Sequence, residues 1–156
     1  MTKKIIILSF ILFVCFSFSI YCSELNVSLS ELEKYVGELI PKNAQRIDMN
    51  MWRIKIYEDD NITQEIILRT KDNTVITAEY NFNAITNNLL ITLRGFYIDN
   101  LEKYGEFVSD NNGVLFWKTN SDNLTKRPIN VALSKVIHNN ELGSFYFIVA
   151  VRLLNN

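Results

Sequence analysis

The chain opens with a long stretch of apolar residues that carries no charge. Lys3 and Lys4 precede an unbroken run from Ile5 to Cys22, and Glu24 is the first acidic residue. A short cationic segment, an apolar run and a boundary with small polar residues form the layout of a cleavable secretory signal. The run also reaches the roughly 18 residues that a helix needs to span a bilayer, so an uncleaved anchor is the alternative. Cleavage is favoured because no cations follow the run to stop its transfer.

Both cysteines of the chain belong to this N-terminal segment. Cys15 lies inside the apolar run and Cys22 lies at its edge, so the rest of the chain has no pair with which to form a disulfide. Residues 19–21 look like a degraded bacterial lipobox, which makes lipid attachment to Cys22 a second possible outcome of export. We therefore expect residues 1–22 to be a signal peptide, a lipoprotein signal or an anchor, and residues 23–156 to form one small domain.

The next segment has the pattern of an amphipathic helix. Ser28 and Glu31 stand at the spacing of a capping box, in which each side chain bonds the other residue's backbone N–H. Apolar residues then recur at helical spacing until Pro41, which ends the run. These apolar residues are Leu29, Leu32, Val36, Leu39 and Ile40.

After the predicted helix the pattern changes to alternation, which is typical of strands. Between residues 44 and 57 the apolar positions change parity near Met51 and Trp52, so a bulge or a break is expected there. Residues 62–70 and 74–82 read as an antiparallel pair around a tight turn. A further strand is expected at residues 89–97.

The second half is expected to contain a short helix followed by strands. Asp99 and Glu102 have helix-start spacing, and Leu101, Tyr104 and Val108 would share one side. Strands are expected at residues 114–119, 129–137 and 145–154, the last being the most apolar and therefore central. The predicted class is α+β: a mostly antiparallel sheet, arranged as a meander, sandwich or partly closed barrel, with an N-terminal amphipathic helix and one short middle helix.

The composition argues against most kinds of metal, nucleotide and catalytic sites. His138 is the only histidine and there are five glycines, which leaves no His-pair metal site and no glycine-rich phosphate loop. The net charge is −1 at pH 7, and it falls to −3 once Lys3 and Lys4 are removed, so nucleic acid is not an expected partner. No cofactor, metal or catalytic residue is predicted. A carboxylate pair, such as Glu79 with a distant partner, is the remaining route to catalysis.

Aromatic side chains are the candidate binding residues. Trp52, Trp117, Tyr80 and Tyr97 lie in predicted strands, where aromatic rings either fill a core or line a ligand groove. Each tryptophan has an apolar neighbour, Met51 or Phe116, that must face the other side of the strand. We therefore expect one tryptophan to be exposed or to line a cleft.

Together these features predict an exported protein of a bacterial cell envelope, located in the periplasm, at the cell surface or outside the cell. Its expected role is a non-enzymatic binding or interaction module for an unknown protein or apolar ligand. Membrane contact is expected only through the N-terminal signal, anchor or lipid. Two alternatives stay open: a structural or assembly protein that acts through sheet-edge pairing, and a small carboxylate-dependent hydrolase.

Overall fold

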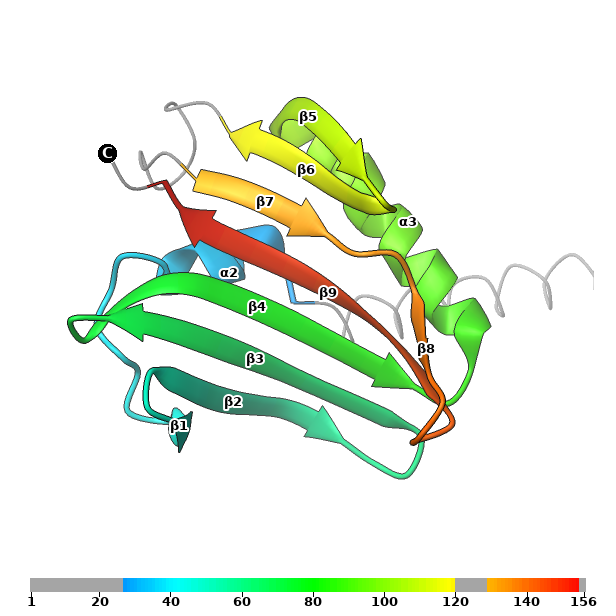
Figure 1. The fold of residues 1–156 in the computed structure, drawn as a ribbon, viewed down its shortest axis with the longest axis horizontal. Coiled ribbons are helices and arrows are strands. Elements are labelled where there is room, and N and C mark those ends of the chain that lie inside the picture. Colours follow the sequence, from blue (N-terminus) through cyan, green and yellow to red (C-terminus); the bar gives the residue numbers. More distant parts are fainter. Residues whose placement is uncertain (1–26, 120–128, 155–156) are drawn as a thin grey trace, which may run out of the picture.

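The fold is an open antiparallel sheet with two helices. The computed structural model describes residues 27–119 and 129–154, so the predicted signal and Cys22 lie outside the described part (Figure 1). Neither described helix combines the length and apolar character needed to cross a membrane. The elements, in chain order, are α2 (Leu29–Tyr35), β1 (Gln45–Asp48), β2 (Met51–Glu58), β3 (Ile62–Lys71), β4 (Thr74–Ala84), α3 (Asn87–Tyr104), β5 (Gly105–Asn111), β6 (Val114–Thr119), β7 (Ile129–Leu133), β8 (Ile137–Asn139) and β9 (Ser144–Leu153).

All described strands belong to one sheet, in the order β1-β2-β3-β4-β9-β7-β6-β5, and every pairing is antiparallel. The short β8 pairs with the beginning of β9, on the edge that β7 occupies farther along. The predicted α+β class with a mostly antiparallel sheet is confirmed. Of the three predicted arrangements, the sandwich and the partly closed barrel are not formed, because the sheet stays open with β1 and β5 at its two ends.

The two halves of the fold have the same order of elements, a helix followed by antiparallel strands. Helix α2 is followed by the consecutive strands β1 to β4, and helix α3 is followed by β5, β6, β7 and β9. The last strand of each half, β4 or β9, lies at the centre and pairs with its counterpart. The halves are thus related by an approximate twofold arrangement, although the sequence shows no internal repeat.

The core lies between the sheet and the helices, which are both on the far side of the sheet in Figure 1. Both helices contact β4 and β9. Alternate residues of these two strands point at the helices, as the two-residue period of a strand requires. The buried residues that face the helices from the two strands are Ala78, Tyr80, Phe82, Phe147, Val149 and Val151. The prediction that residues 145–154 form a central strand is confirmed.

Helix α2 begins as predicted and ends early. The Ser28 hydroxyl accepts a hydrogen bond from the Glu31 backbone and the Glu31 carboxylate accepts one from the Ser28 backbone. The helix stops at Tyr35 instead of continuing to Pro41. Gly37 has a positive φ of 83° and its N–H donates to the carbonyl of Val75 at 2.7 Å. The segment after Tyr35 is therefore drawn into pairing with the start of β4, and tertiary pairing outweighs the helical pattern.

The predicted strand at residues 89–97 and the separate short helix from Asp99 are wrong, because these residues form one 18-residue helix, α3. Leu90, Leu93, Tyr97 and Leu101 are buried at spacings of three, four and four residues, which is one face of a helix. Val108, which was expected to share that face, lies in β5. Ile91 and Phe96, which are residue types that favour strands, are exposed on the rest of the helix surface.

The parity change near Met51 is explained by a turn. Strand β1 ends at Asp48, β2 starts at Met51, and the pairing between them has an irregular register between Arg46 and Asp48. The predicted break is confirmed. Because β2 starts a new alternation, Trp52 and Ile54 face the helices while Met51 and Arg53 face away.

Candidate binding groove on the helix-free face

Three of the four aromatic residues predicted to bind a ligand belong to the buried core, and two of them, Tyr80 and Tyr97, take no part in lining a groove. Tyr80 and Tyr97 have 0% and 2% of their surface exposed, and their rings lie 6.3 Å apart between the sheet and α3. The hydroxyl of Tyr80 donates to Gln64 Oε1 at 3.0 Å, and that of Tyr97 donates to the carbonyl oxygen of Val27. Burial raises the pKa of both hydroxyls far above the ordinary value.

Trp52 is half-buried near the β1 end of the sheet. It faces the helix side, opposite Leu68 of β3, and packs against the margin of the core. The guanidinium carbon of Arg46 lies 6.0 Å from the centre of its ring, at the outer limit of a cation–π contact. The Trp52 ring therefore covers the margin of the core at this end of the sheet.

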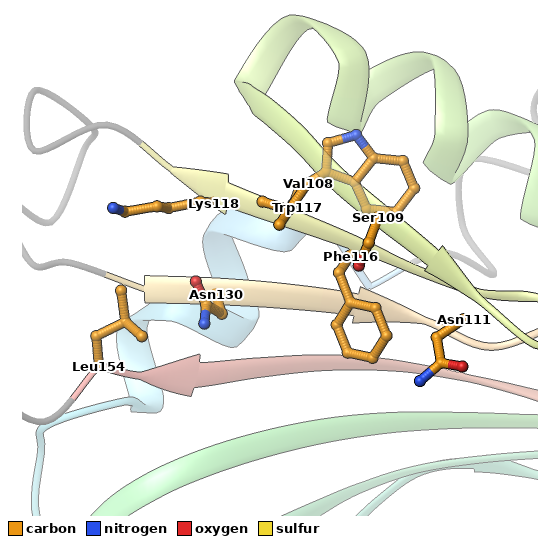
Figure 2. A pocket seen from close by; sticks show the side chains of 8 residues that line it. All are labelled: Val108, Ser109, Asn111, Phe116, Trp117, Lys118, Asn130 and Leu154. Atoms are coloured by element: carbon orange, nitrogen blue, oxygen red, sulfur yellow. The ribbon is translucent and has the colours of Figure 1, made fainter.

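Trp117 is also largely buried, with 2% of its surface exposed, but it contributes to the wall of a groove. Its ring meets the ring of Phe107 edge to face, 5.5 Å between centres. Its neighbour Phe116 points in a different direction (Figure 2). The two adjacent side chains therefore lie on opposite faces of β6, and Phe116 is the residue that faces away from the helices.

The groove lies over β5, β6 and β7 on the helix-free face of the sheet and has a volume of about 460 Å³. Strands β5 and β6 supply most of its wall, while Asn130 of β7 and Leu154, next to the end of β9, close one side (Figure 2). The lining residues are Val108, Ser109, Asn111, Phe116, Trp117, Lys118, Asn130 and Leu154.

Strand register explains why a hollow forms around Phe116. This residue lies directly opposite Ser109 of β5 and Ala132 of β7, and directly opposed residues share a face of the sheet. Both neighbours are small, so the directly opposed residues cover little of the Phe116 ring, which is half-buried. An apolar surface is thereby kept open in the middle of three strands.

A bulge in β5 completes the apolar wall. The pairing of β5 with β6 shifts between Phe107 and Ser109, so that Val108 is an extra residue in the strand. Bulges redirect side chains in this way. Val108 has 60% of its surface exposed and lines the groove together with Ser109.

One end of the groove is polar and cationic. Lys118 lies opposite Asn130, which in turn lies opposite Arg152, so the three side chains form a row on the helix-free face. Within the described part of the chain, neither Lys118 nor Arg152 has an ion-pair partner. The groove therefore combines an apolar body with a cationic and hydrogen-bonding end, an arrangement that suits an amphipathic group with an anionic or acceptor end.

The carboxylate-dependent catalysis considered for Glu79 gains no support from the position of this residue. Glu79 lies on the helix-free face, where its two carboxylate oxygens accept from Arg69 Nε at 2.6 Å and Arg69 Nη2 at 3.2 Å. This hydrogen-bonded pairing raises the pKa of Arg69 and occupies the carboxylate proposed for catalysis. Among residues 27–119 and 129–154 there is no group of three or more histidine, cysteine or acidic side chains that could hold a metal ion.

Most groove residues were missed by sequence reasoning. The helical pattern assigned to Val108 concealed its place in a strand, and the pairing of Phe116 with two small residues depends on register. The adjacent apolar pair Phe116 and Trp117 was the one usable signal. Comparisons with protein families, with curated proteins and with solved structures find no match for this chain.

Proposed function

We propose that the protein is an exported, non-enzymatic binding module of a bacterial cell envelope, and that the groove on its helix-free face is the binding site. The observation that carries the proposal is Phe116, an aromatic side chain directed away from the core between two small neighbours. An uncovered apolar surface beside polar groups is the usual character of a ligand site. The ligand class that fits is an apolar group with an anionic or hydrogen-bond-accepting end.

The export part of the proposal rests on the N-terminal sequence. Lys3, Lys4 and the uncharged run to Cys22 have the layout of a signal. The intact mass of the purified protein tests it, because cleavage removes a defined mass and lipid attachment to Cys22 adds one. A mass equal to that of the whole chain would leave the anchor as the explanation.

Binding at the groove is tested with 1-anilinonaphthalene-8-sulfonate, which has an aromatic body and one sulfonate and therefore matches both ends of the groove. We expect Phe116→Ala and Lys118→Gln each to weaken its binding about five- to tenfold, as the loss of one apolar or charged contact implies. Ile91→Ala and Lys42→Gln are the matched controls, since both residues are exposed and lie outside the groove. Equal binding by the groove variants and the controls would contradict the proposal.

Energy transfer from tryptophan locates the bound probe. Trp117 lines the groove, whereas Trp52 lies toward the opposite end of the sheet. Trp117→Phe should therefore remove most of the transfer to the probe, and Trp52→Phe should remove little. The reverse result would place the probe elsewhere on the protein.

A further inference from the structure

The groove borders a sheet edge that no strand covers within the described part of the chain. Strand β5 is the last in the sheet order and pairs only with β6. No strand among residues 27–119 and 129–154 pairs with the backbone groups along its other side. An exposed edge of this kind is a template for pairing with another polypeptide.

The two ends of the sheet differ in how well they are protected. Strand β1 has four residues and an irregular register, and its Arg46 side chain folds back to donate to the carbonyls of Asp48 and Met49. Short length, irregularity and a cation are features that discourage pairing. Strand β5 has seven residues and contains no lysine, arginine or proline. Its Phe107 and Val108 have 52% and 60% of their surfaces exposed.

Hydrogen bonds at both ends of β5 fix the position of this strand in the absence of a partner. Helix α3 runs into β5 without a loop, and the Gly105 N–H at the junction donates to the carbonyl of Leu101, a fully buried residue. At the other end the Asp110 carboxylate accepts a hydrogen bond of 2.9 Å from the Gly113 N–H. A fixed strand loses little conformational entropy on binding, which favours association.

We propose that the edge of β5 binds an extended segment of a partner polypeptide as an additional strand, and that this segment alternates apolar residues with lysine or arginine. The inference rests on the proposed function, since a segment of this pattern would place its apolar side chains against Val108 and the groove on one face and its cations on the other face, where Asp110 lies. In this mode of recognition the backbone bonds give affinity and the alternate side chains give specificity.

Charge argues for a cationic partner and against a second copy of the same strand. The charged residues of β5 are Glu106 and Asp110, and neither has an ion-pair partner among the described residues. Two copies of β5 would bring four carboxylates together with no cation between them. Like charges across paired strands are destabilising, whereas opposite charges are favourable.

The test uses three synthetic nonapeptides and the purified protein. The first alternates valine with lysine, the second alternates valine with glutamate, and the third is the first peptide with alternate backbone nitrogens methylated. We expect the first to bind at least about tenfold more tightly than the others, because the second reverses the charge match and the third removes several backbone hydrogen bonds. Equal affinity of the first and third peptides would overturn the inference, since it would show attraction without strand pairing.

Amide hydrogen exchange shows where the peptide lies. Binding of the valine–lysine peptide should slow exchange at alternate backbone amides of β5 and leave those of β1 unchanged. Glu106→Gln combined with Asp110→Asn should weaken binding about three- to tenfold, while Glu141→Gln, an exposed acid in a distant turn, should change it little. Protection confined to other strands would overturn the inference. The naphthalene probe reports on the groove separately, so the edge can fail while the groove still binds.

Discussion

The hydroxyl of Tyr97 on α3 donates a hydrogen bond to the backbone carbonyl of Val27, 70 positions earlier in the sequence. The Tyr80 hydroxyl on β4 also forms a hydrogen bond with the Val27 backbone, so two buried rings from different elements contact the backbone of the same residue. These two hydrogen bonds attach Val27, which lies just before the start of α2, to strand β4 and to helix α3. They therefore link the two halves of the fold on the side of the sheet that carries the helices.

Loss of the Tyr97 hydroxyl should destabilise the protein by leaving the Val27 carbonyl without its donor. We expect Tyr97→Phe to lower the free energy of unfolding by about 1–3 kcal/mol, the usual cost of a buried unsatisfied acceptor. Urea unfolding measures this difference. Tyr146→Phe is the control, because Tyr146 is half-buried on the helix-free face, and it should change stability by less than about 0.5 kcal/mol. Similar effects of the two substitutions would show that the Val27 contact adds nothing.

Alkaline pH should unfold the protein through the two buried tyrosines. Burial raises the pKa of Tyr80 and Tyr97 above the ordinary value of 10.0, so the folded state holds their protons more firmly than the unfolded state does. Their contribution to stability is therefore complete below pH 10 and is lost as the pH rises beyond that value. Urea midpoints between pH 8 and pH 11.5 should fall accordingly, and Tyr97→Phe should make the fall shallower. Ionisation of every tyrosine near pH 10 in a folded protein, by absorbance at 295 nm and circular dichroism, would contradict this.

Removing one partner of the hydrogen bond between Tyr80 and Gln64 should cost more stability than replacing both partners with apolar residues. Gln64 is buried, its Oε1 accepts from Tyr80, and its Nε2 has no hydrogen-bond partner within the described part of the chain. Tyr80→Phe alone should lower the free energy of unfolding by about 1–3 kcal/mol, because it leaves both the oxygen and the nitrogen of the buried Gln64 amide without a hydrogen-bond partner. Adding Gln64→Leu to that variant should recover about 1 kcal/mol or more, since the unpaired polar group is removed. A double variant less stable than Tyr80→Phe would show that the amide is satisfied in solution.

The turn between β2 and β3 should respond to acid. The carboxylate of Asp59 accepts hydrogen bonds from the Tyr57 hydroxyl at 2.7 Å and from the backbone N–H groups of Asn61 and Ile62. The Tyr57 bond first, and then the two backbone bonds, lower the pKa of Asp59. Its contribution is present above the ordinary pKa of 3.8 and is lost as the pH falls through the lower value of the folded state. Asp59→Asn should therefore show a smaller loss of stability between pH 5 and pH 2 in thermal unfolding than the unchanged protein.

Local signals in the sequence predicted much of the fold. The capping box at Ser28 and Glu31 marked the start of α2, and the alternation of residues 62–70 and 74–82 marked β3 and β4. Helix α3 was missed because the segment from Leu89 to Tyr97 contains residues that favour strands, although its buried positions do follow a helical period. In that segment tertiary packing outweighs intrinsic preference.

The groove could not be predicted because it is made by pairing between distant segments. The space beside Phe116 exists because Ser109 and Ala132 stand opposite it, and those partners are set by the register of three strands. The bulge at Val108 decides which face of β5 carries that side chain. A shift of one residue would have turned the same side chains to the other face.

The position of β9 bears on the order in which the protein folds. Its ten residues come last among the described strands and pair with both β4 and β7, so the two halves of the sheet cannot join until β9 is available. Contacts between residues so far apart in sequence form slowly. Before β9 is in place, the strands β1 to β4 and β5 to β7 form two separate half-sheets. Complete folding therefore requires that β9 has been synthesised and is free to pair with both of them.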